Sequence, residues 1–455
     1  MTLGRLQHSW LPLLAVTALV ALAGGCSTPA ASTVTPSVTA ATPAATPAAT
    51  TSAPRPTGVG PLDSVELTWS EGVDPGAASG QHLNVPAGWS ARVWANIPGA
   101  RLAAWTPDGR LVVSTGKQDT IVLVTPTSAH EAPTVTTLLD GLDFPQGVAF
   151  TQVDGKALLV VGEGHAITTW QYDSGSVSNP QTVVSDLPGG GHGAKGVAVD
   201  GDLIAYSLGS SSNRDPADRL AQPERAVIAE VRIDGSNPRV IATGVRNGFG
   251  LAFAPDGTLF TAVNQSDNQP YPFDDGSGLY GDVVTEFVNE NPVDQVTRVS
   301  PGIDLGWPYC IPDTRGREDL RNLPYVADPE FNPTQEQLDC NSLPPVQLGL
   351  PAHSAPLGLA FTTGTPLAEQ WGDGALVGAH GSWNRTPPRM PYIAFAAWDE
   401  GTEALGTLEM VVTGFQLEDG SRWGRAVAAI PGPDGALYVT DDAAGLVYRI
   451  APPGV

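Results

Sequence analysis

The chain has 455 residues, with 23 Lys or Arg against 47 Asp or Glu, so its formal net charge at pH 7 is -24. Such an acidic surface repels nucleic acid, whose phosphates dominate its affinity for proteins, and it repels anionic membranes, which leaves a small neutral or cationic ligand as the expected partner. The 52 glycines and 42 prolines favour many short strands joined by turns and argue against a fold of long helices.

Residues 1–25 have the order of a secretory signal peptide, with Arg5, the apolar run LPLLAVTALVALA and small residues before Cys26. The sequence LAGGC is similar to a lipobox, which predicts that Cys26 is the acylated first residue of the mature protein. Ala23 stands where Leu is commoner, and an ordinary signal peptide with an incidental cysteine is the alternative. Each buried methylene contributes roughly 0.8 kcal/mol, so two or three acyl chains anchor firmly. We expect an extracytoplasmic protein, attached to the cell membrane through this lipid anchor only.

Residues 27–60 are nearly all Ala, Thr, Pro and Ser, and they show no apolar period. Such a segment buries too little apolar surface to offset its conformational entropy, so we expect a disordered tether over residues 26–60. The folded domain is expected to occupy residues 61–455.

The folded region repeats one pattern, in which a turn with Asp-Gly precedes a short apolar strand. Each copy is a hairpin signal, and a β-rich repeat of roughly 45 to 60 residues is typical of propeller blades. We predict an all-β, six-bladed β-propeller in which the one long gap, between Gly257 and Gly374, holds an insertion at residues 264–350. Seven blades are the alternative, if that gap hides a degenerate blade. The copies are WTPDGRLVVSTG (105–116), TQVDGKALLVVGEG (151–164), VAVDGDLIAYSLG (197–209), LAFAPDGTLFTAVN (251–264), QWGDGALVGAHG (370–381) and PGPDGALYVTDD (431–442).

Cys310 and Cys340 are the cysteines that remain after Cys26 in a chain expected outside the cytoplasm. There an even pair favours a disulfide, because a metal site needs further ligands nearby. Closing this loop would stabilise the fold by about 3.5 kcal/mol on the chain-entropy estimate. We expect a structural disulfide that pins the long insertion.

A propeller scaffold does not specify a function, because many unrelated activities share it. Several long segments, in order from about residue 189 to residue 450, carry more information: ERAVIAEVRIDGSNPRVIATGVRNGFGLAFAPDGTLF, VDQVTRVSPGIDLGWPYC, LPAHSAPLGLAF, GAHGSWNRTPP and WGRAVAAIPGPDGALYVTDDAAGLVYRI. They resemble the glucose/sorbosone dehydrogenase family, and most of all its sorbosone dehydrogenase-like branch. The resemblance implies a six-bladed propeller that oxidises an aldose or a related aldehyde with pyrroloquinoline quinone (PQQ) and calcium. Because the chain has no haem motif, electrons are expected to pass to an external acceptor.

This oxidation needs a base, because a hydroxyl proton leaves the sugar while hydride leaves the adjacent C–H bond. His192, in GGGHGAKG, stands where the family has its catalytic histidine, and a pKa near neutrality suits general-base catalysis. From the residues alone, a histidine on a glycine loop is more simply a solvated turn residue. His353 in LPAHSAPLG matches a cofactor-side position and is the second candidate. Lys195 stands where relatives carry Arg or Lys, and it either contacts the quinone or solvates its loop.

Arg246 and Asn247 match the Arg-Asn pair with which the family binds its cofactor and polarises the reactive carbonyl. A guanidinium fork suits carbonyl and carboxylate oxygens, and its charge stabilises a developing oxyanion. PQQ carries three carboxylates, so further cations are expected at the site. The matching segments place them at Arg385 in GSWNR and at Arg422 and Arg425 in SRWGR. A peripheral ion pair is the alternative role for these three, and a plain turn for Arg-Asn-Gly.

Calcium prefers oxygen ligands, including backbone carbonyls, which leave little signature in a sequence. The resemblance implies calcium ligands at Asn264, Gln265 and Ser266, with Asp294 as the acidic residue downstream.

Two stretches depart from the family pattern. Where soluble sugar dehydrogenases have an Asp that orients the catalytic histidine, this chain reads LGSSSNRD, with Ser210 to Asn213, and the sorbosone-like branch has a similar Ser-rich run. AVNQSDN, which includes Asn264 to Asn268, and Asp294-Gln295 replace the family's Asp-Asn-Gly-Arg-Asp and Asp-Glu. Two other functions therefore stay open: a non-catalytic binding propeller tethered to the envelope, and a calcium-dependent lactonase of the related propeller class, against which the basic cluster argues.

Overall fold

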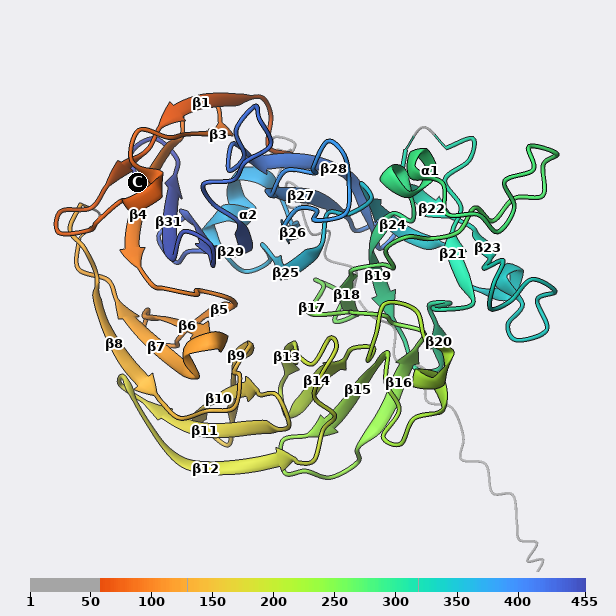
Figure 1. Cartoon of the computed structure of the whole chain (residues 1–455). Helices are drawn as coiled ribbons and strands as arrows, with labels where there is room; N and C mark the ends of the chain where they lie inside the picture. Colours follow the sequence, from red (N-terminus) through yellow and green to blue (C-terminus); the bar gives the residue numbers. More distant parts are fainter. Residues whose placement is uncertain (1–57, 129, 318) are drawn as a thin grey trace, which may run out of the picture. The chain divides into compact units, whose positions relative to one another are not determined.

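Six β-sheets are arranged as the blades of a propeller around a common axis (Figure 1). The computed structural model describes residues 58–128, 130–317 and 319–455. The predicted signal peptide, the acylated Cys26 and nearly all of the predicted tether lie outside these residues. The Gly58 N–H donates to the Trp371 carbonyl at 3.2 Å, so the folded unit already includes residues before the expected start at residue 61. The predicted all-β, six-bladed fold is confirmed.

Each blade is a meander of four antiparallel strands, of which the first lies nearest the axis and the fourth farthest from it. Blade 1 contains β5 (Ala103–Trp105), β6 (Leu111–Thr115), β7 (Thr120–Thr125) and β8 (Thr134–Leu139). Blade 2 contains β9 (Gly147–Val153), β10 (Lys156–Gly162), β11 (Ile167–Asp173) and β12 (Ser176–Val184). Blade 3 contains β13 (Val197–Asp200), β14 (Leu203–Leu208), β15 (Val227–Arg232) and β16 (Arg239–Thr243), with the short β20 (Ile303–Asp304) outside them.

The other three blades take strands from more distant parts of the chain. Blade 4 contains β17 (Gly250–Phe253), β18 (Leu259–Val263), β19 (Asp294–Val299) and β24 (Val346–Leu350), with β22 (Arg321–Leu323) at its edge. Blade 5 contains β25 (Pro356–Phe361), β26 (Gly374–Ala379), β27 (Tyr392–Asp399) and β28 (Ala404–Val412). Blade 6 contains β29 (Ala426–Pro431), β30 (Leu437–Asp441), β31 (Leu446–Ala451) and β4 (Ser90–Asn96), with β2 (Thr68–Trp69) at its edge.

The sixth blade joins the two ends of the folded unit. Its strand β4 comes from the N-terminal side and pairs antiparallel with β31 from the C-terminal side, with Ser90 opposite Ala451. In Figure 1 the orange β4 lies beside the dark blue β31. Because closure of the ring leaves no blade without a neighbour, it protects the sheet edges that would otherwise pair with other chains.

The Asp-Gly repeats explain the blade count. In five blades the Asp-Gly turn joins the first strand to the second, and the glycine has a positive φ, from 57° at Gly201 to 81° at Gly435. Residues with a Cβ adopt that conformation at a cost, so glycine is favoured there. Blade 5 differs, because α2 (Pro366–Trp371) lies between its first two strands and Gly374 is already the first residue of β26.

The long gap in the repeat holds no seventh blade. The predicted insertion at residues 264–350 was too large, because it contains β19 and β24, the third and fourth strands of blade 4. The true insertions are residues 264–293, with α1 (Thr285–Glu290), and residues 300–345, with the two-stranded sheet of β21 (Cys310–Pro312) and β23 (Tyr325–Ala327). A second small sheet pairs β1 (Leu62–Glu66) with β3 (His82–Pro86).

Apolar side chains fill the centre of the propeller. The innermost strands pack against one another in order around the axis, and β29 packs against β5 to close the ring. Phe249, Leu357 and Val427 are fully or almost fully buried in this central cluster. No helix among the described residues is long and apolar enough to cross a bilayer.

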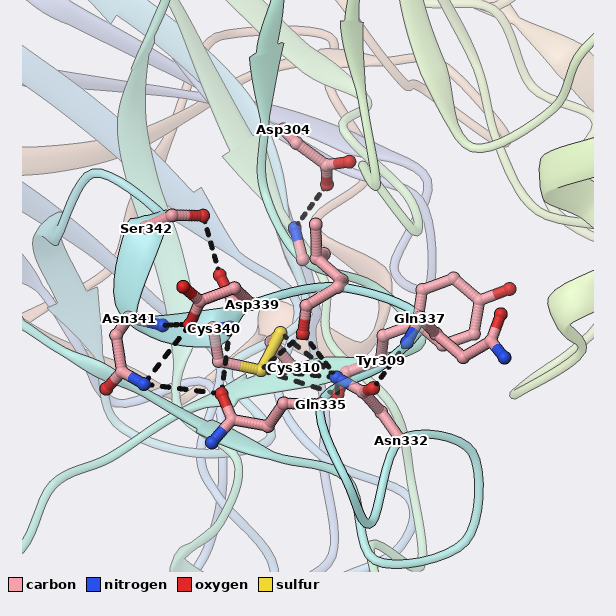
Figure 2. The surroundings of a disulfide bond; sticks show 12 residues. Asp304, Tyr309, Cys310, Asn332, Gln335, Gln337, Asp339, Cys340, Asn341 and Ser342 are labelled. Carbon is pink, nitrogen blue, oxygen red and sulfur yellow. Dashed lines mark hydrogen bonds between the residues drawn. A yellow bond between two sulfur atoms is a disulfide. The ribbon is translucent and has the colours of Figure 1, made fainter.

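The predicted disulfide between Cys310 and Cys340 is present (Figure 2). Cys310 begins β21, and Cys340 begins a short 3-10 helix, η4 (Cys340–Ser342). Both are buried in a small apolar cluster that includes Leu323 and Val346 of blade 4. The bond therefore ties the outer insertion to the blade from which it emerges.

We expect the double variant Cys310→Ser/Cys340→Ser to unfold with about 3.5 kcal/mol less free energy than the wild type. The two cysteines are separated by 30 residues, and the free chain regains that loop entropy when the bond is absent. Urea denaturation measures the difference. A reducing agent should lower the stability of the wild type and leave the double variant unchanged, and equal stabilities without reductant would contradict the prediction.

Candidate active site

Polar and charged side chains gather at the end of the propeller where the innermost strands begin. Lys195 precedes β13, Arg246 precedes β17 and Arg425 precedes β29. Backbone hydrogen bonds link these starting points, since Gly147 donates to the Lys195 carbonyl at 2.9 Å and Ser210 donates to the Arg246 carbonyl at 2.7 Å. Residues far apart in the sequence are thereby brought to one end of the axis.

His192 lies on the glycine loop between β12 and β13, against the Ser-rich run that follows β14. Its Nδ1 is 2.8 Å from Ser210 Oγ, and its backbone N–H donates to the Ser210 carbonyl at 2.9 Å. Ser210 donates its own hydroxyl hydrogen to the Ser212 carbonyl at 2.7 Å. A hydroxyl has one hydrogen, so Ser210 Oγ must accept from His192 and the imidazole hydrogen must be on Nδ1. His192 Nε2 is then left with a free lone pair.

Glycines allow these two loops to approach closely. Gly191 has a φ of 54°, and a Cβ there would lie 2.3 Å from the Ser211 carbonyl oxygen. A Cβ on Gly209 would lie 2.5 Å from the His192 Cβ. Larger residues at either position would separate His192 from Ser210, so the Gly-rich sequence serves this contact.

Burial keeps His192 uncharged. Desolvation, followed by the charge of Arg246, lowers the pKa of His192 from its ordinary value of 6.5 to about 4. His192 is therefore neutral at pH 7 and can accept a proton at Nε2, but a pKa of about 4 makes it a weaker base than the near-neutral value expected from the sequence. Because the unfolded chain binds this proton at higher pH than the folded one, the fold loses stability as the pH falls from about 6.5 to about 4.

We expect Ser210→Asp to raise the pKa of His192 well above 4, because a carboxylate at Nδ1 stabilises the imidazolium. An NMR titration of the imidazole nitrogens measures the shift. Ser211→Asp is the matched control, since it adds the same charge on the neighbouring, exposed side chain. An equal shift in both variants, or none in Ser210→Asp, would contradict the role of Ser210.

Arg246 is 3% exposed and is held mainly by neutral groups. Its Nε and one terminal nitrogen donate to the backbone and side-chain oxygens of Asn213, at 3.0 and 2.9 Å, and its other terminal nitrogen donates to the Asn264 carbonyl at 3.0 Å. The nearest carboxylate oxygen, on Asp267, is 3.8 Å away. Three of five N–H groups are thus used, and the buried charge lacks a close anion. The half-buried Asn247 side chain makes no hydrogen bond among the described residues.

His353 is part of the same network. Its Nε2 donates to the Val288 carbonyl at 2.6 Å, and its Nδ1 is 3.4 Å from Asp267 Oδ1. Burial lowers the pKa of His353, but the bonds to Asp267 and Val288 outweigh it, so the net shift is upward. Asp267 therefore lies between His353 and Arg246.

The loop expected to bind calcium is only partly suited to it. The carbonyl of Asn264 already accepts a hydrogen bond from Arg246, so this cation competes with calcium for the oxygen, and the role of Asn264 as a ligand stays a prediction. Asp294, 1% exposed, accepts from the backbone N–H groups of Gln265 and Ala355 at 2.8 and 2.9 Å, and burial raises its pKa to about 6. Within the described ranges no three or more His, Cys, Asp or Glu side chains are grouped to hold a metal. The carbonyls of the buried Gln265 and Ser266 accept no hydrogen bond from any described residue.

Lys195 has a different role from the expected one. Its side chain is fully buried, and its ammonium donates to the carbonyls of Gly164, Pro188 and Gly193 at 2.9, 2.9 and 2.5 Å. All three N–H bonds are used, so none is left for a cofactor. Burial, more than nearby charges, lowers its pKa to about 8. Lys195 anchors the His192 loop.

The three arginines expected at the cofactor do not form a single cluster. Arg385 pairs with Glu290 at the end of α1 and donates to the Asn289 carbonyl at 3.0 Å. Arg422 donates to the Ser382 and Arg389 carbonyls, and Arg425 to the His380 and Gly381 carbonyls. All three thus support the loop between β26 and β27, and only Arg425 adjoins further charged groups at the start of the innermost strands.

Sequence reasoning missed the group beside Arg425. His380 Nε2 is 2.7 Å from Asp442 Oδ1, and Arg101 pairs with Asp442 Oδ2 at 2.8 Å. Burial opposes ionisation of Asp442, but His380 and Arg101 outweigh it and lower its pKa to about 2. Arg101 and Asp442 are separated by 341 residues and meet only because blade 6 closes onto blade 1. The Asp441-Asp442 pair ending a strand was the only signal in the sequence.

Comparison with known proteins points to one family. A family model described as TrAA12-like matches residues 83–452. The chain is 25% identical over 262 residues to an uncharacterized protein of Borreliella burgdorferi, which covers 57% of this chain and 60% of that protein. It is 25% identical over 256 residues to the pyrroloquinoline quinone-dependent pyranose dehydrogenase of Coprinopsis cinerea, which covers 51% of this chain and 33% of that protein.

Solved structures agree on the fold. The holo form of the PQQ domain of Coprinopsis cinerea pyranose dehydrogenase has a TM-score of 0.70 at 21% identity, covering 84% of this chain and 100% of that domain. The calcium structure of a Trichoderma reesei carbohydrate-active enzyme of family AA12 has a TM-score of 0.68 at 19% identity, covering 84% of this chain and 99% of that chain. The chain spans 60% or less of the length of the curated relatives that it matches.

Proposed function

Because the chain belongs to the TrAA12-like family, we propose that it is an oxidoreductase that oxidises a sugar, or a related aldehyde, with PQQ. The motifs of the sequence resemble the same group of PQQ-dependent sugar dehydrogenases. The observation that carries the proposal is that one site holds a neutral base in a fixed orientation and a buried cation that lacks a close anion. His192 supplies the first and Arg246 the second.

The described residues fit an anionic, planar cofactor. Arg246 is a buried charge with two unused N–H groups, and a carboxylate or quinone oxygen would complete its bonding. Asn247 adjoins it with a side chain free to bind. Arg101 and Arg425 add positive charge at the same end of the blades, with Asp442 as the acid between them. Acids accompany these cations, with Asp267 near Arg246 and Asp442 near Arg425, so it is the unused N–H groups of Arg246 that favour a ligand with carboxylates.

In the proposed reaction His192 Nε2 accepts the proton of the substrate hydroxyl group. Its Nδ1–H remains on Ser210, which holds the ring in one tautomer throughout the transfer. Asp267 favours the imidazolium that forms, whereas Arg246 disfavours it and so returns the base to its neutral state. PQQ, when bound, supplies the electrophilic carbonyl that takes the hydride. Arg246 orients that oxygen and stabilises negative charge on it.

We also propose that calcium is bound by the carbonyl oxygens of Gln265 and Ser266. Buried carbonyls without a donor are the kind of ligand that calcium accepts. Asp294 holds this loop through the Gln265 N–H, so its part is to position the carbonyls. A calcium-dependent lactonase would instead need acidic side chains converging on the metal, and residues 58–455, apart from 129 and 318, group no such set.

Reconstitution tests the proposed function. Purified protein loaded with PQQ and calcium is expected to reduce an artificial dye with at least one aldose or aldehyde and to retain quinone absorbance after desalting. Treatment with EGTA should remove both properties, and calcium should restore them. A flat dye assay across a sugar panel with no retained quinone would favour the non-catalytic binding propeller instead.

We propose further that the protein acts outside the cytoplasmic membrane, anchored through acylated Cys26, and passes electrons to an external acceptor. The signal-like order of residues 1–25 supports this location. The mass of the mature N-terminal peptide, isolated from membranes, tests it, and an unmodified Cys26 would overturn the lipid anchor.

A further inference from the structure

We propose that Arg225 is a positioning residue that holds His192 in its working orientation. The inference rests on the proposed function of His192 as the base. Arg225 follows the 3-10 helix η3 (Pro216–Leu220) and is 8% exposed. Its guanidinium donates to four backbone carbonyls, those of Gly189, Gly190, Gly209 and Ser210, at 2.8, 2.8, 3.0 and 3.3 Å.

These four carbonyls belong to two separate loops. Gly189 and Gly190 are in the loop that carries His192, and Gly209 and Ser210 are in the loop that carries its hydrogen-bond partner. One planar guanidinium therefore spans both loops, which a lysine ammonium, as a compact point charge, cannot do. If either loop moved, the Nδ1 contact between His192 and Ser210 would lengthen and the tautomer would no longer be selected.

The surrounding residues keep Arg225 in place. Its backbone N–H donates to the Asp218 carbonyl at 3.2 Å, and the Asp218 carboxylate accepts the Ser211 N–H at 2.7 Å. Asp218, 4% exposed, is the anion whose charge acts on Arg225. The same acid thus balances the buried cation and fixes the Ser-rich loop.

The His192 loop has little other support. It joins β12 to β13 without a helix or strand of its own, and glycines give it many accessible conformations. Arg225 binds its first two glycine carbonyls, while Lys195 binds those of Pro188 and Gly193. Hydrogen bonds from these two buried cations therefore hold the loop in place, as backbone hydrogen bonds hold a strand. Lys195 secures its ends, and Arg225 adds a side-chain link to Ser210 beside the bonds that His192 itself makes to that residue.

Arg225→Lys tests this role in the full chain, because it keeps the charge and loses the fork. In protein without cofactor, NMR of labelled imidazole nitrogens should show His192 of the wild type as the Nδ1–H tautomer and that of the variant as a mixture of tautomers. The chain has 7 histidines, so His192→Gln identifies the signal. In loaded protein, kcat should fall about tenfold to a hundredfold with KM little changed, as expected when a catalytic group is displaced.

Arg449→Lys is the matched control. Arg449 is also buried, at 7% exposure, but it is on β31 and binds Asp434 away from the site. Arg449→Lys should lower the melting temperature without altering the His192 tautomer. If Arg225→Lys does the same and no more, the positioning role is wrong and Arg225 is only structural.

Gly209→Ala is a second variant that tests the same contact. If Arg225→Lys does not fold, Gly209→Ala should produce the same mixture of tautomers, because its new Cβ would press on His192 and part the loops with Arg225 intact. If the His192 tautomer is unchanged in Gly209→Ala, the inference is wrong. The tautomer is measured without cofactor or turnover. An inactive wild type would therefore contradict the proposed function, and the tautomer result would still test the positioning role of Arg225.

Discussion

His192→Ala is expected to lower dye-linked sugar oxidation by about a hundredfold to ten-thousandfold, the usual contribution of a positioned general base. The loss should be in kcat, because the variant removes the proton acceptor and leaves Arg246 and the other cations in place. Because His192→Ala also removes the 2.8 Å contact between Nδ1 and Ser210 Oγ, a modest fall in melting temperature is expected as well.

The measurement is steady-state dye reduction, with PQQ retention after desalting recorded for each protein. His82→Ala is the control, since His82 is an exposed histidine on β3, in the small sheet outside the blades. Added imidazole should restore part of the activity of His192→Ala and none of a denatured sample. An active His192→Ala variant would transfer the role of the base to another residue, of which His353 is the next candidate.

Arg246→Lys is expected to weaken PQQ binding by about tenfold to a hundredfold. Each charge-assisted hydrogen bond contributes about 1.5 to 3 kcal/mol, and lysine cannot reproduce the fork that leaves two N–H groups for a ligand. Quenching of tryptophan fluorescence, with 11 tryptophans in the chain, measures the Kd.

Arg246→Ala should have a wider effect than Arg246→Lys. Besides the proposed cofactor contact, Arg246 holds Asn213 and Asn264 through three hydrogen bonds. Its removal also takes away the guanidinium 3.8 Å from Asp267, so the melting temperature should fall as well. Arg232→Ala, which breaks an exposed pair with Asp202, is the control for loss of one arginine. An unchanged Kd in Arg246→Lys would contradict the proposed cofactor contact.

Much of the fold was predictable because it depends on local turn chemistry. The Asp-Gly turns mark the joint of the first two strands in five blades, since a positive φ favours glycine there. The spacing of these turns gives six blades. The insertion was overestimated because β19 and β24 carry no such turn between them, and only their pairing in the sheet of blade 4 reveals them.

The candidate site was predictable in part. His192, Arg246 and His353 were named from a family resemblance, and they do lie around one network, although their roles stay predictions. Lys195 and Arg385 were named from the same resemblance, and the structure has both of them engaged with the protein. A sequence lists which side chains are cationic but not which carbonyls or acids they will meet.

By itself the sequence determined the all-β repeat, the disulfide pair and the residue types that sugar oxidation needs. Only the tertiary structure decided their chemical states. The proton on His192 Nδ1 follows from Ser210 donating to Ser212, and the low pKa of His192 follows from burial beside Arg246. Arg101 meets Asp442 across 341 residues, and Arg225 reaches two loops at once. Turn conformation depends on neighbouring residues, whereas desolvation and charge pairing depend on groups that the chain brings together only when the propeller closes.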